Sequence, residues 1–530
     1  MAEHGPWRPL KDGATLARNA YSWNRVANML YVEQPVTVGF SYTTEDLDNK
    51  AAFGDDQAAL DNYRVIQTFL ARFSHLRLHD LYLSGESYGG HYLPSLARLI
   101  LNKNQEAAVA AAPPAAPPAA LPPSPPSKDQ AQAAALPPSL PPPKIKLRGF
   151  LVGNPSTDPV LQLIGQVDTL HSRHLLPPSL YERWTTLCAS TPTVAHLGST
   201  ACVQVQRQVL EAVKEYDVYS ISTPPCPLLA AGEEEANISS SSSSSSARRR
   251  KSTTAPAVAP AEKKKGGRGG GGGGGGGFYL LGNDKLWAGL LRLDRGNSTA
   301  AATPATVGGS NSSTAPSPLH HHRYLRSSSP SPSPTPPTPP SLLPSFPTSP
   351  PLPYESCQAL YGATYLNRLD VKTAIHASEW VSWEDCSSLV LDNYQRSDWS
   401  LFLEPLFKSL VEKEGEAGRE GGGQGLRVLL YSGEDDTVCS SKGTEMWLET
   451  LGWATVKEWA PWSVREGGTE GGKKGKGKVG KAAVPVVAGM KKKYENGVVF
   501  ATVNGAGHAV PSFKPREALQ LFMDFLEGRL

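Results

Sequence analysis

The 530-residue chain has no apolar run long enough to cross a membrane, so its sequence predicts no transmembrane helix. Its formal net charge is only +3 at pH 7, which is too small to indicate a nucleic-acid partner. No cysteines and histidines are spaced like the ligands of a zinc site, and the run His320 to His322 lies in a tract of biased composition. We therefore expect neither a metal nor a cofactor.

Large parts of the sequence also lack the apolar side chains that a packed core requires. These parts are 106–143 (Ala and Pro), 227–353 (runs of Ser, Gly and Pro), 412–425 (Glu and Gly) and 464–485 (Gly and Lys). Such segments bury too little apolar surface to offset the entropy that ordering them would cost, so we expect disordered surface insertions. The remainder consists of 1–105, 144–226 and 354–530 without the two short segments 412–425 and 464–485, and it is long enough for one large α/β domain.

Among the motifs that are present, the G-x-S-x-G pentapeptide centred on Ser87 is the most informative. The preceding residues Asp80–Leu83 predict a short strand, and Tyr92–Leu101 predict a helix with an apolar face. A serine at such a strand-to-helix corner lies on a tight turn that exposes its hydroxyl group. We expect Gly85 and Gly89 to be small because the strand and the helix pass close to each other there.

Two later segments supply a candidate base and candidate acids. The β-rich run Val498–Val503 ends before a glycine-rich loop that contains His508, and the apolar run Leu426–Tyr431 leads into the acidic run Glu434 to Asp436. Both groups are therefore expected beyond strand ends. The chain order of serine, acid and histidine matches an α/β-hydrolase triad and differs from the orders in chymotrypsin and subtilisin.

Together with the motifs around them, Ser87, the acidic run and His508 make the chain resemble the serine carboxypeptidase family. The motifs that carry the resemblance are EHGPW (3–7), YSWNRVANMLYVEQPVTVGFSY (21–42), GESYGGHYLP (85–94), GNPSTDP (153–159), YLNRLDVKTAIH (365–376), YSGEDDTVC (431–439) and NGAGHAVP (504–511). Several long motifs in one order make a chance match very rare.

The resemblance implies that Ser87 is the nucleophile and His508 the general base and acid. Asp436, the second acid of the G-x-x-D pattern, is the group that would orient the imidazole. For the neighbouring Glu434 and Asp435 we expect a solvated acidic loop. A serine hydroxyl is a poor nucleophile until a neutral imidazole accepts its proton, and a buried carboxylate stabilises the imidazolium that results.

Three further residues are expected to contact the substrate. The backbone N–H of Tyr88, directly after the nucleophile, is predicted to stabilise the oxyanion. Glu3 and Glu86 match two family glutamates that share a proton and bind the terminal carboxylate of the peptide. Because like charges held close together cannot both ionise, this pair implies cleavage at acid pH.

The sequence departs from the family at its start. Relatives carry a W-N-G-G-P-G stretch before the EHGPW motif, and a glycine N–H of that stretch is their second oxyanion donor. The sequence begins at Met1 without it, and residues 1–12 contain no apolar core of a signal peptide. We interpret this as an incomplete gene model or a fragment, and we expect the activity of the chain as written to be weak.

The cysteines fit the same family. By resemblance Cys188 pairs with Cys202, and Cys226 pairs with Cys357 around the long insertion. Cys386 would pair in relatives with a cysteine of the upstream segment, so we expect it to be an orphan. Such disulfides imply an oxidising compartment: the secretory pathway, a vacuole or lysosome, or the extracellular space. Sequons in 227–353 could then be glycosylated.

The last cysteine has two possible roles. Cys439 matches a thiol near the active site in some relatives, and it could equally be an ordinary buried cysteine.

The expected fold is a mainly parallel, mixed sheet with helices on both faces and a helical cap at 161–221. The predicted strands are Met29–Val32, Leu81–Leu83, Ile145–Val152, Val428–Leu430 and Val498–Val503. The leading hypothesis is a serine carboxypeptidase that acts on peptides and proteins through an acyl-enzyme at acid pH. The alternatives are a carboxypeptidase-like acyltransferase, against which Glu86 argues because those enzymes usually carry Asp there, and a truncated, inactive homologue. The oligomeric state stays open.

Overall fold

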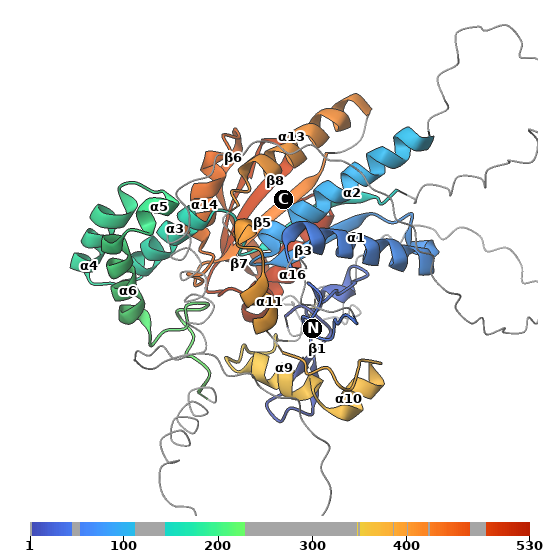
Figure 1. Cartoon of the computed structure of the whole chain (residues 1–530), viewed down its shortest axis with the longest axis horizontal. Helices are drawn as coiled ribbons and strands as arrows, with labels where there is room; N and C mark the ends of the chain where they lie inside the picture. The colour runs from blue at the N-terminus through green and yellow to red at the C-terminus, as the bar shows by residue number, and fades with distance from the viewer. Residues whose placement is uncertain are drawn as a thin grey trace, which may run out of the picture.

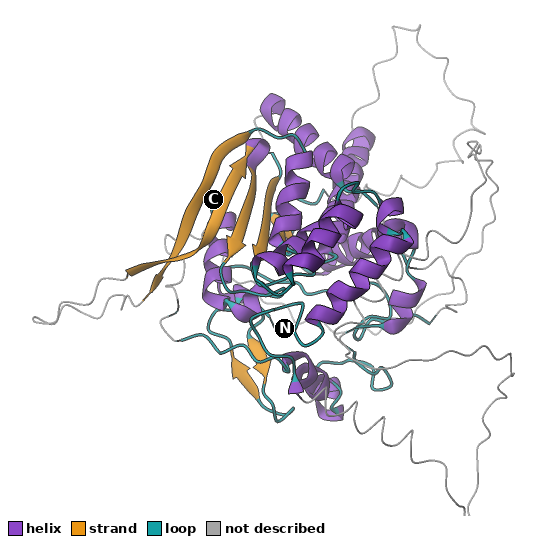
Figure 2. Cartoon of the chain, turned by 90° about the vertical axis from the view of Figure 1, so that its left-hand side faces the viewer, coloured by secondary structure: helices purple, strands orange, loops and turns teal. Residues whose placement is uncertain are grey.

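A computed structural model describes residues 3–44, 53–111, 144–227, 347, 350–384, 386–399, 401–421, 425–466 and 484–530. Its centre is a six-stranded sheet with the order β3-β4-β5-β8-β7-β6 (Figures 1 and 2). The first four strands are parallel, and β7 and β6 extend the sheet in antiparallel order. The expected mixed, mainly parallel sheet is confirmed.

The strands of this sheet are β3 (Leu81–Glu86), β4 (Leu147–Gly153), β5 (Arg427–Gly433), β8 (Val498–Val503), β7 (Val484–Tyr494) and β6 (Thr455–Glu466). A separate two-stranded ribbon is formed by β1 (Trp7–Pro9) and β2 (Leu16–Arg18). Four of the predicted strands are therefore present with small shifts of their ends.

Helices cover both faces of the sheet. The α-helices of the described residues are, in chain order, α1 (Asp55–Arg72), α2 (Gly89–Ala111), α3 (Pro159–Ser172), α4 (Pro178–Trp184), α5 (Val194–Leu197), α6 (Thr200–Val213), α9 (Gln358–Leu366), α10 (Leu369–Ala374), α11 (Ser388–Asn393), α12 (Arg396–Trp399), α13 (Glu404–Gly421), α14 (Ser441–Thr450), α15 (Val510–Phe513) and α16 (Pro515–Leu526).

The central strands divide their side chains between two cores with the two-residue period of a β-strand. Phe150, Leu430 and Phe500 belong to the core that contains residues of α1, α2, α13 and α14. Leu151 and Leu429 belong to the opposite core, which α16 completes. Because both faces are covered, the inner parallel strands β4, β5 and β8 are mostly apolar and buried, as the sequence runs suggest.

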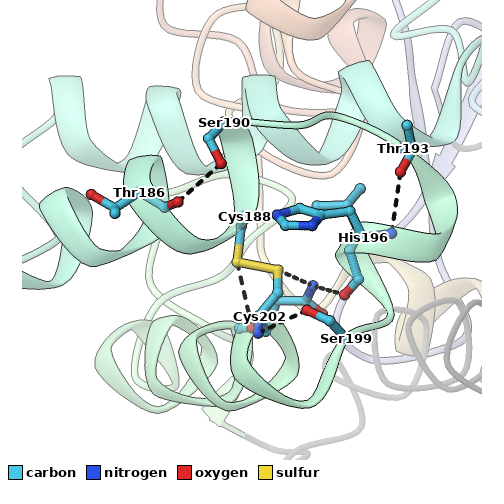
Figure 3. The surroundings of a disulfide bond; sticks show 9 residues. Thr186, Cys188, Ser190, Thr193, His196, Ser199 and Cys202 are labelled. Carbon is cyan, nitrogen blue, oxygen red and sulfur yellow. Dashed lines mark hydrogen bonds between the residues drawn. A yellow bond between two sulfur atoms is a disulfide. The ribbon is translucent and has the colours of Figure 1, made fainter.

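The cap, formed by α3 to α6, extends from one side of the sheet (Figure 1). It has its own apolar cluster, which surrounds the disulfide between Cys188 and Cys202. Beside this disulfide, Ser199 caps the start of α6 by accepting a hydrogen bond from the N–H of Cys202 at 3.4 Å (Figure 3). The predicted helical cap and its disulfide are confirmed.

The second expected disulfide, between Cys226 and Cys357, is also present. It joins the residues that flank the long insertion at 228–346, which lies outside the described residues together with its sequons and the run His320 to His322. Cys386 and Cys439 take part in neither disulfide. A bond that closes so long a loop stabilises the fold chiefly by restricting the unfolded chain.

The predicted strand Met29–Val32 is wrong. Residues 28–34 have no strand structure in the described part of the chain, and the side chains of Leu30 and Tyr31 are 43% and 42% exposed. A cavity of about 1080 Å³ lies between this segment and β3, which forms one edge of the sheet. A β-prone segment becomes a strand only where a neighbouring strand pairs with its backbone.

Ordered structure extends into three predicted insertions. Helix α2 continues through Ala111, beyond the expected end at 105, and α13 enters the Glu/Gly-rich segment. Strands β6 and β7 reach Glu466 and Val484 from either side of the Gly/Lys-rich segment. Among the described residues, no helix is both long and apolar enough to cross a membrane.

Candidate active site

Ser87 lies at the corner between β3 and α2 in a left-handed backbone conformation, with φ of 58°. This region is unfavourable for a residue with a Cβ atom, so surrounding bonds must hold it. The N–H of Ser87 donates to the carbonyl of Gly153 at 2.9 Å, and its carbonyl accepts from the N–H groups of Gly90 and Ser156, each at 2.9 Å. The corner that the pentapeptide predicts is therefore present and fixed from both sides.

The close approach at this corner falls at Gly90, beside the two glycines that the sequence indicates. A Cβ atom on Gly90 would collide with the carbonyl oxygen of Ser156, whereas one on Gly89 would meet only Val152 at 3.7 Å. At Gly85 the nearest atom would be Leu93 Cδ1 at 3.3 Å. The expectation of tight packing is thus right for Gly85 and wrong for Gly89.

Asp436 and His508 form a hydrogen-bonded pair, in which Nδ1 of the imidazole lies 2.6 Å from Oδ2 of the carboxylate. The side chain of Asp436 also accepts bonds from Asn154 Nδ2 at 2.8 Å and from the N–H groups of Val438 and Cys439 at 2.9 and 3.2 Å. Asp436 is 1% exposed. These donors satisfy its buried charge and fix its orientation toward the ring.

The protonation of His508 is governed by opposing effects. Burial favours the neutral ring, but the charge and hydrogen bond of Asp436, with smaller contributions from Glu3 and Asp217, raise the pKa of His508 above its usual value. The carboxylate of Asp436 thus favours the imidazolium, the form that His508 takes when it accepts a proton.

The topology explains how distant segments of the chain meet at this edge of the sheet. Ser87 follows β3, Asn154 follows β4, Asp436 follows β5 and His508 follows β8, and these four strands are parallel neighbours. The carboxyl ends of parallel strands meet at one edge of a sheet, where ligands bind in open α/β folds. The hydroxyl of Ser87 lies beside the buried thiol of Cys439.

Tyr88 is held firmly at the start of α2. Its carbonyl accepts bonds from the N–H groups of His91 and Tyr92 at 2.9 and 3.2 Å, and its ring stacks on that of His91 at 4.4 Å and 2°. His91 in turn contacts the carboxylate of Asp55 at 3.4 Å, with both side chains buried. The peptide group between Ser87 and Tyr88 is thereby oriented by a rigid neighbourhood.

Glu3 and Glu86 also lie together, joined by a hydrogen bond between their carboxyl groups. Burial first, and then the neighbouring charge of Glu3, raise the pKa of Glu86 well above its ordinary value. Arg8 anchors the start of the chain, since its guanidinium donates to the backbone carbonyls of Glu3 and Pro511 at 3.2 and 3.1 Å. The glutamates predicted to act together are therefore adjacent in space, and Glu86 directly precedes Ser87 in the sequence.

The expected solvated acidic loop is wrong for Asp435, which is 3% exposed. Its carboxylate pairs with Arg173 at 3.0 Å and accepts a short hydrogen bond from Ser222. These partners connect the loop after β5 to the cap and to the segment that follows it. The acidic sequence alone does not show that Asp435 points inward, because the residues that bind its carboxylate come from remote segments.

The sequence analysis missed Asn154, whose amide binds Asp436 and whose Oδ1 accepts the N–H of Gly433 at 3.1 Å. Its position directly after a buried strand, in the GNPSTDP motif, is the signal that could have identified it. The described residues contain no group of three or more His, Cys, Asp or Glu side chains placed to hold a metal ion.

Comparison with known proteins places these features in context. A family model described as "Serine carboxypeptidase" matches residues 1–112, 128–265 and 320–528, well over half of the chain. Serine carboxypeptidase-like 36 of Arabidopsis thaliana is 25% identical across 99% of this chain and 72% of its own length. Serine carboxypeptidase-like 26 of Oryza sativa subsp. japonica is 25% identical across 99% of this chain and 76% of its own length.

A solved structure has a similar fold. It is the crystal structure of Kex1(delta)p, described as a prohormone-processing carboxypeptidase from Saccharomyces cerevisiae, with a TM-score of 0.53 and 16% identity. The match covers 99% of this chain and 79% of that chain. At this identity the likeness concerns the fold alone, and it confirms the expected α/β-hydrolase architecture.

Proposed function

Because the chain belongs to the serine carboxypeptidase family, we propose that it releases C-terminal residues from peptides and proteins through an acyl-enzyme formed on Ser87. The observation that carries the proposal is the buried pair of Asp436 and His508, joined at 2.6 Å on the strand-end edge that also carries the strained serine corner. Three further hydrogen bonds fix the carboxylate of Asp436 toward the ring, as expected for a histidine whose orientation and tautomer matter for proton transfer.

In the proposed mechanism, His508 removes the proton from the Ser87 hydroxyl while the oxygen attacks the last peptide carbonyl. Asp436 keeps the proton of the imidazole on Nδ1, so Nε2 is the acceptor, and it stabilises the imidazolium that forms. The N–H of Tyr88 donates to the developing oxyanion. His508 then protonates the departing amine, and water attacks the acyl-enzyme with the same histidine as base.

Glu86 and Glu3 are proposed to recognise the free carboxylate of the substrate. The raised pKa of Glu86 keeps a proton on the pair at acid pH, and a protonated carboxyl group can donate a hydrogen bond to that carboxylate. Once the pair ionises, the same groups repel the substrate. Peptide binding is therefore expected to be strongest at acid pH.

The two disulfides support a location in an oxidising compartment, namely the secretory pathway, a vacuole or lysosome, or the extracellular space. Peptides and proteins are the proposed substrates. The proposal requires no metal and no cofactor.

Replacing Glu86 by Gln tests this function and the role of the acid pair together. In the wild type, KM for a peptide should rise as the pH increases through the raised pKa of the pair, because binding loses its donor. The amide of Gln donates at every pH, so KM of Glu86→Gln should stay nearly constant across that range. The measurement is the release of the C-terminal amino acid between pH 4 and 8, with Glu458→Gln on β6 as a matched control.

The possible outcomes separate the two claims. No released amino acid from the wild-type chain would contradict the carboxypeptidase assignment. Release with the same rise of KM in the wild type and in Glu86→Gln would contradict only the role of the acid pair.

A further inference from the structure

The segment Asp217–Ile221, which we call the strap, connects the end of the cap to both loops that carry the proposed acid and base. The carbonyl of Val218 accepts bonds from the N–H and the hydroxyl of Thr437 at 3.0 and 2.8 Å. The carbonyl of Tyr219 accepts the N–H of His508 at 2.8 Å. The strap therefore bridges the residue after Asp436 and the histidine itself.

Asp217 determines the local shape of the strap. It is 4% exposed, and its Oδ1 accepts the backbone N–H of Tyr219 at 3.0 Å. The N–H of Tyr219 is thus fixed by Asp217, while the carbonyl of the same residue holds the backbone of His508. A carboxylate that accepts the backbone N–H two residues ahead closes a compact turn, and this bond gives the strap its bend.

Asp217 also interacts electrostatically with the pair of Asp436 and His508. The charged groups facing it are Asp436, from the loop after β5, and His508, from the loop after β8. Burial, reinforced by the charge of Asp436, raises the pKa of Asp217 to about 6, although the Tyr219 N–H and His508 oppose the shift. Above that pH its negative charge stabilises the imidazolium form of His508.

We propose that Asp217 is a positioning residue of this site: it holds the strap so that His508 stays aligned with Asp436, and it places a second carboxylate beside the imidazole. The proposal rests on the proposed function for its kinetic consequences only. Its structural basis is the chain of two hydrogen bonds from Asp217 through the backbone of Tyr219 to His508. These bonds connect the end of the cap to His508, the proposed general base.

Two substitutions separate the two contributions of Asp217. Asp217→Asn keeps an acceptor for the Tyr219 N–H but removes the charge, so the pKa of His508 should fall. The acid limb of the kcat profile should then move to lower pH, with kcat at its plateau close to that of the wild type. Asp217→Ala also removes the acceptor, and it should lower kcat by about 10- to 100-fold through misalignment, with KM little changed.

The matched control is Asp168→Asn, the same change at another carboxylate of the cap, where the partner is the Tyr181 hydroxyl at 3.1 Å. The direct measurement is the pKa of the His508 ring by NMR titration of the full chain, with the signal assigned through His508→Ala. This readout does not require enzymatic activity, so a failure of the proposed function leaves it intact.

The expected result is a lower His508 pKa in Asp217→Asn and an unchanged value in Asp168→Asn. A His508 pKa that is the same in Asp217→Asn and in the wild type would overturn the proposal, as would full wild-type kcat in a folded Asp217→Ala variant. If Asp217→Ala does not fold, the titration of Asp217→Asn decides alone.

Discussion

Ser87→Ala is expected to lower kcat for release of the C-terminal residue by about 10⁶-fold, because it removes the atom that forms the acyl-enzyme. Removing one member of a catalytic unit costs nearly as much as removing all of them, so only transition-state binding by the remaining groups would persist. Alanine fits the backbone of the corner no worse than serine, so the fold should be retained.

The control for this substitution is Ser84→Ala. Ser84 lies on the same strand, three residues earlier, and its side chain is exposed. Activity should be measured by mass spectrometry of a peptide ladder at acid pH, with circular dichroism to verify folding. Residual turnover of Ser87→Ala within tenfold of the wild type would exclude this serine as the nucleophile.

Asp436→Asn is expected to lower kcat by about 10⁴-fold with little change in KM. The amide of Asn can present a donor to the ring, which favours the tautomer with its proton on Nε2 and leaves no base toward Ser87. The substitution also removes the charge that raises the pKa of His508. The pKa of the histidine should therefore fall in the same variant.

The comparison variant is Glu434→Gln, an isosteric change at a half-buried acid of the same loop. It should retain activity within a few-fold, because the side chain of Glu434 has no proposed role at the site. Both variants can be followed by kcat against pH together with NMR titration of His508. Equal kcat for Asp436→Asn and Glu434→Gln would contradict the assignment of Asp436.

The local parts of this site can be predicted from sequence because each is encoded in a short segment. The strand, the pentapeptide and the following helix define the corner at Ser87, and its left-handed φ agrees with that prediction. The runs before Asp436 and His508 are apolar except for Arg427 and Thr502, as expected for strands covered on both faces. Alignment of these strands at one edge then follows from the parallel order of the sheet.

The remaining parts depend on contacts between remote segments. Asn154 binds Asp436, which lies 282 residues further along the chain. Asp217 is connected to His508 only through the backbone of Tyr219. Met29–Val32 has a strong β-propensity, yet no neighbouring strand pairs with it in the described residues. Pairing, burial and hydrogen-bond partners are properties of the folded chain, and local composition does not specify them.

The central claim is that the site cleaves at a free C-terminus. It is tested most directly by incubating the wild-type chain at acid pH with two peptides that differ only in a C-terminal carboxylate or amide. Glu86 and Glu3 would bind the carboxylate and gain nothing from the amide. We predict stepwise loss of single residues from the carboxylate peptide and at least tenfold slower release from the amide. Equal rates on the two peptides, or cleavage at internal bonds, would contradict the account.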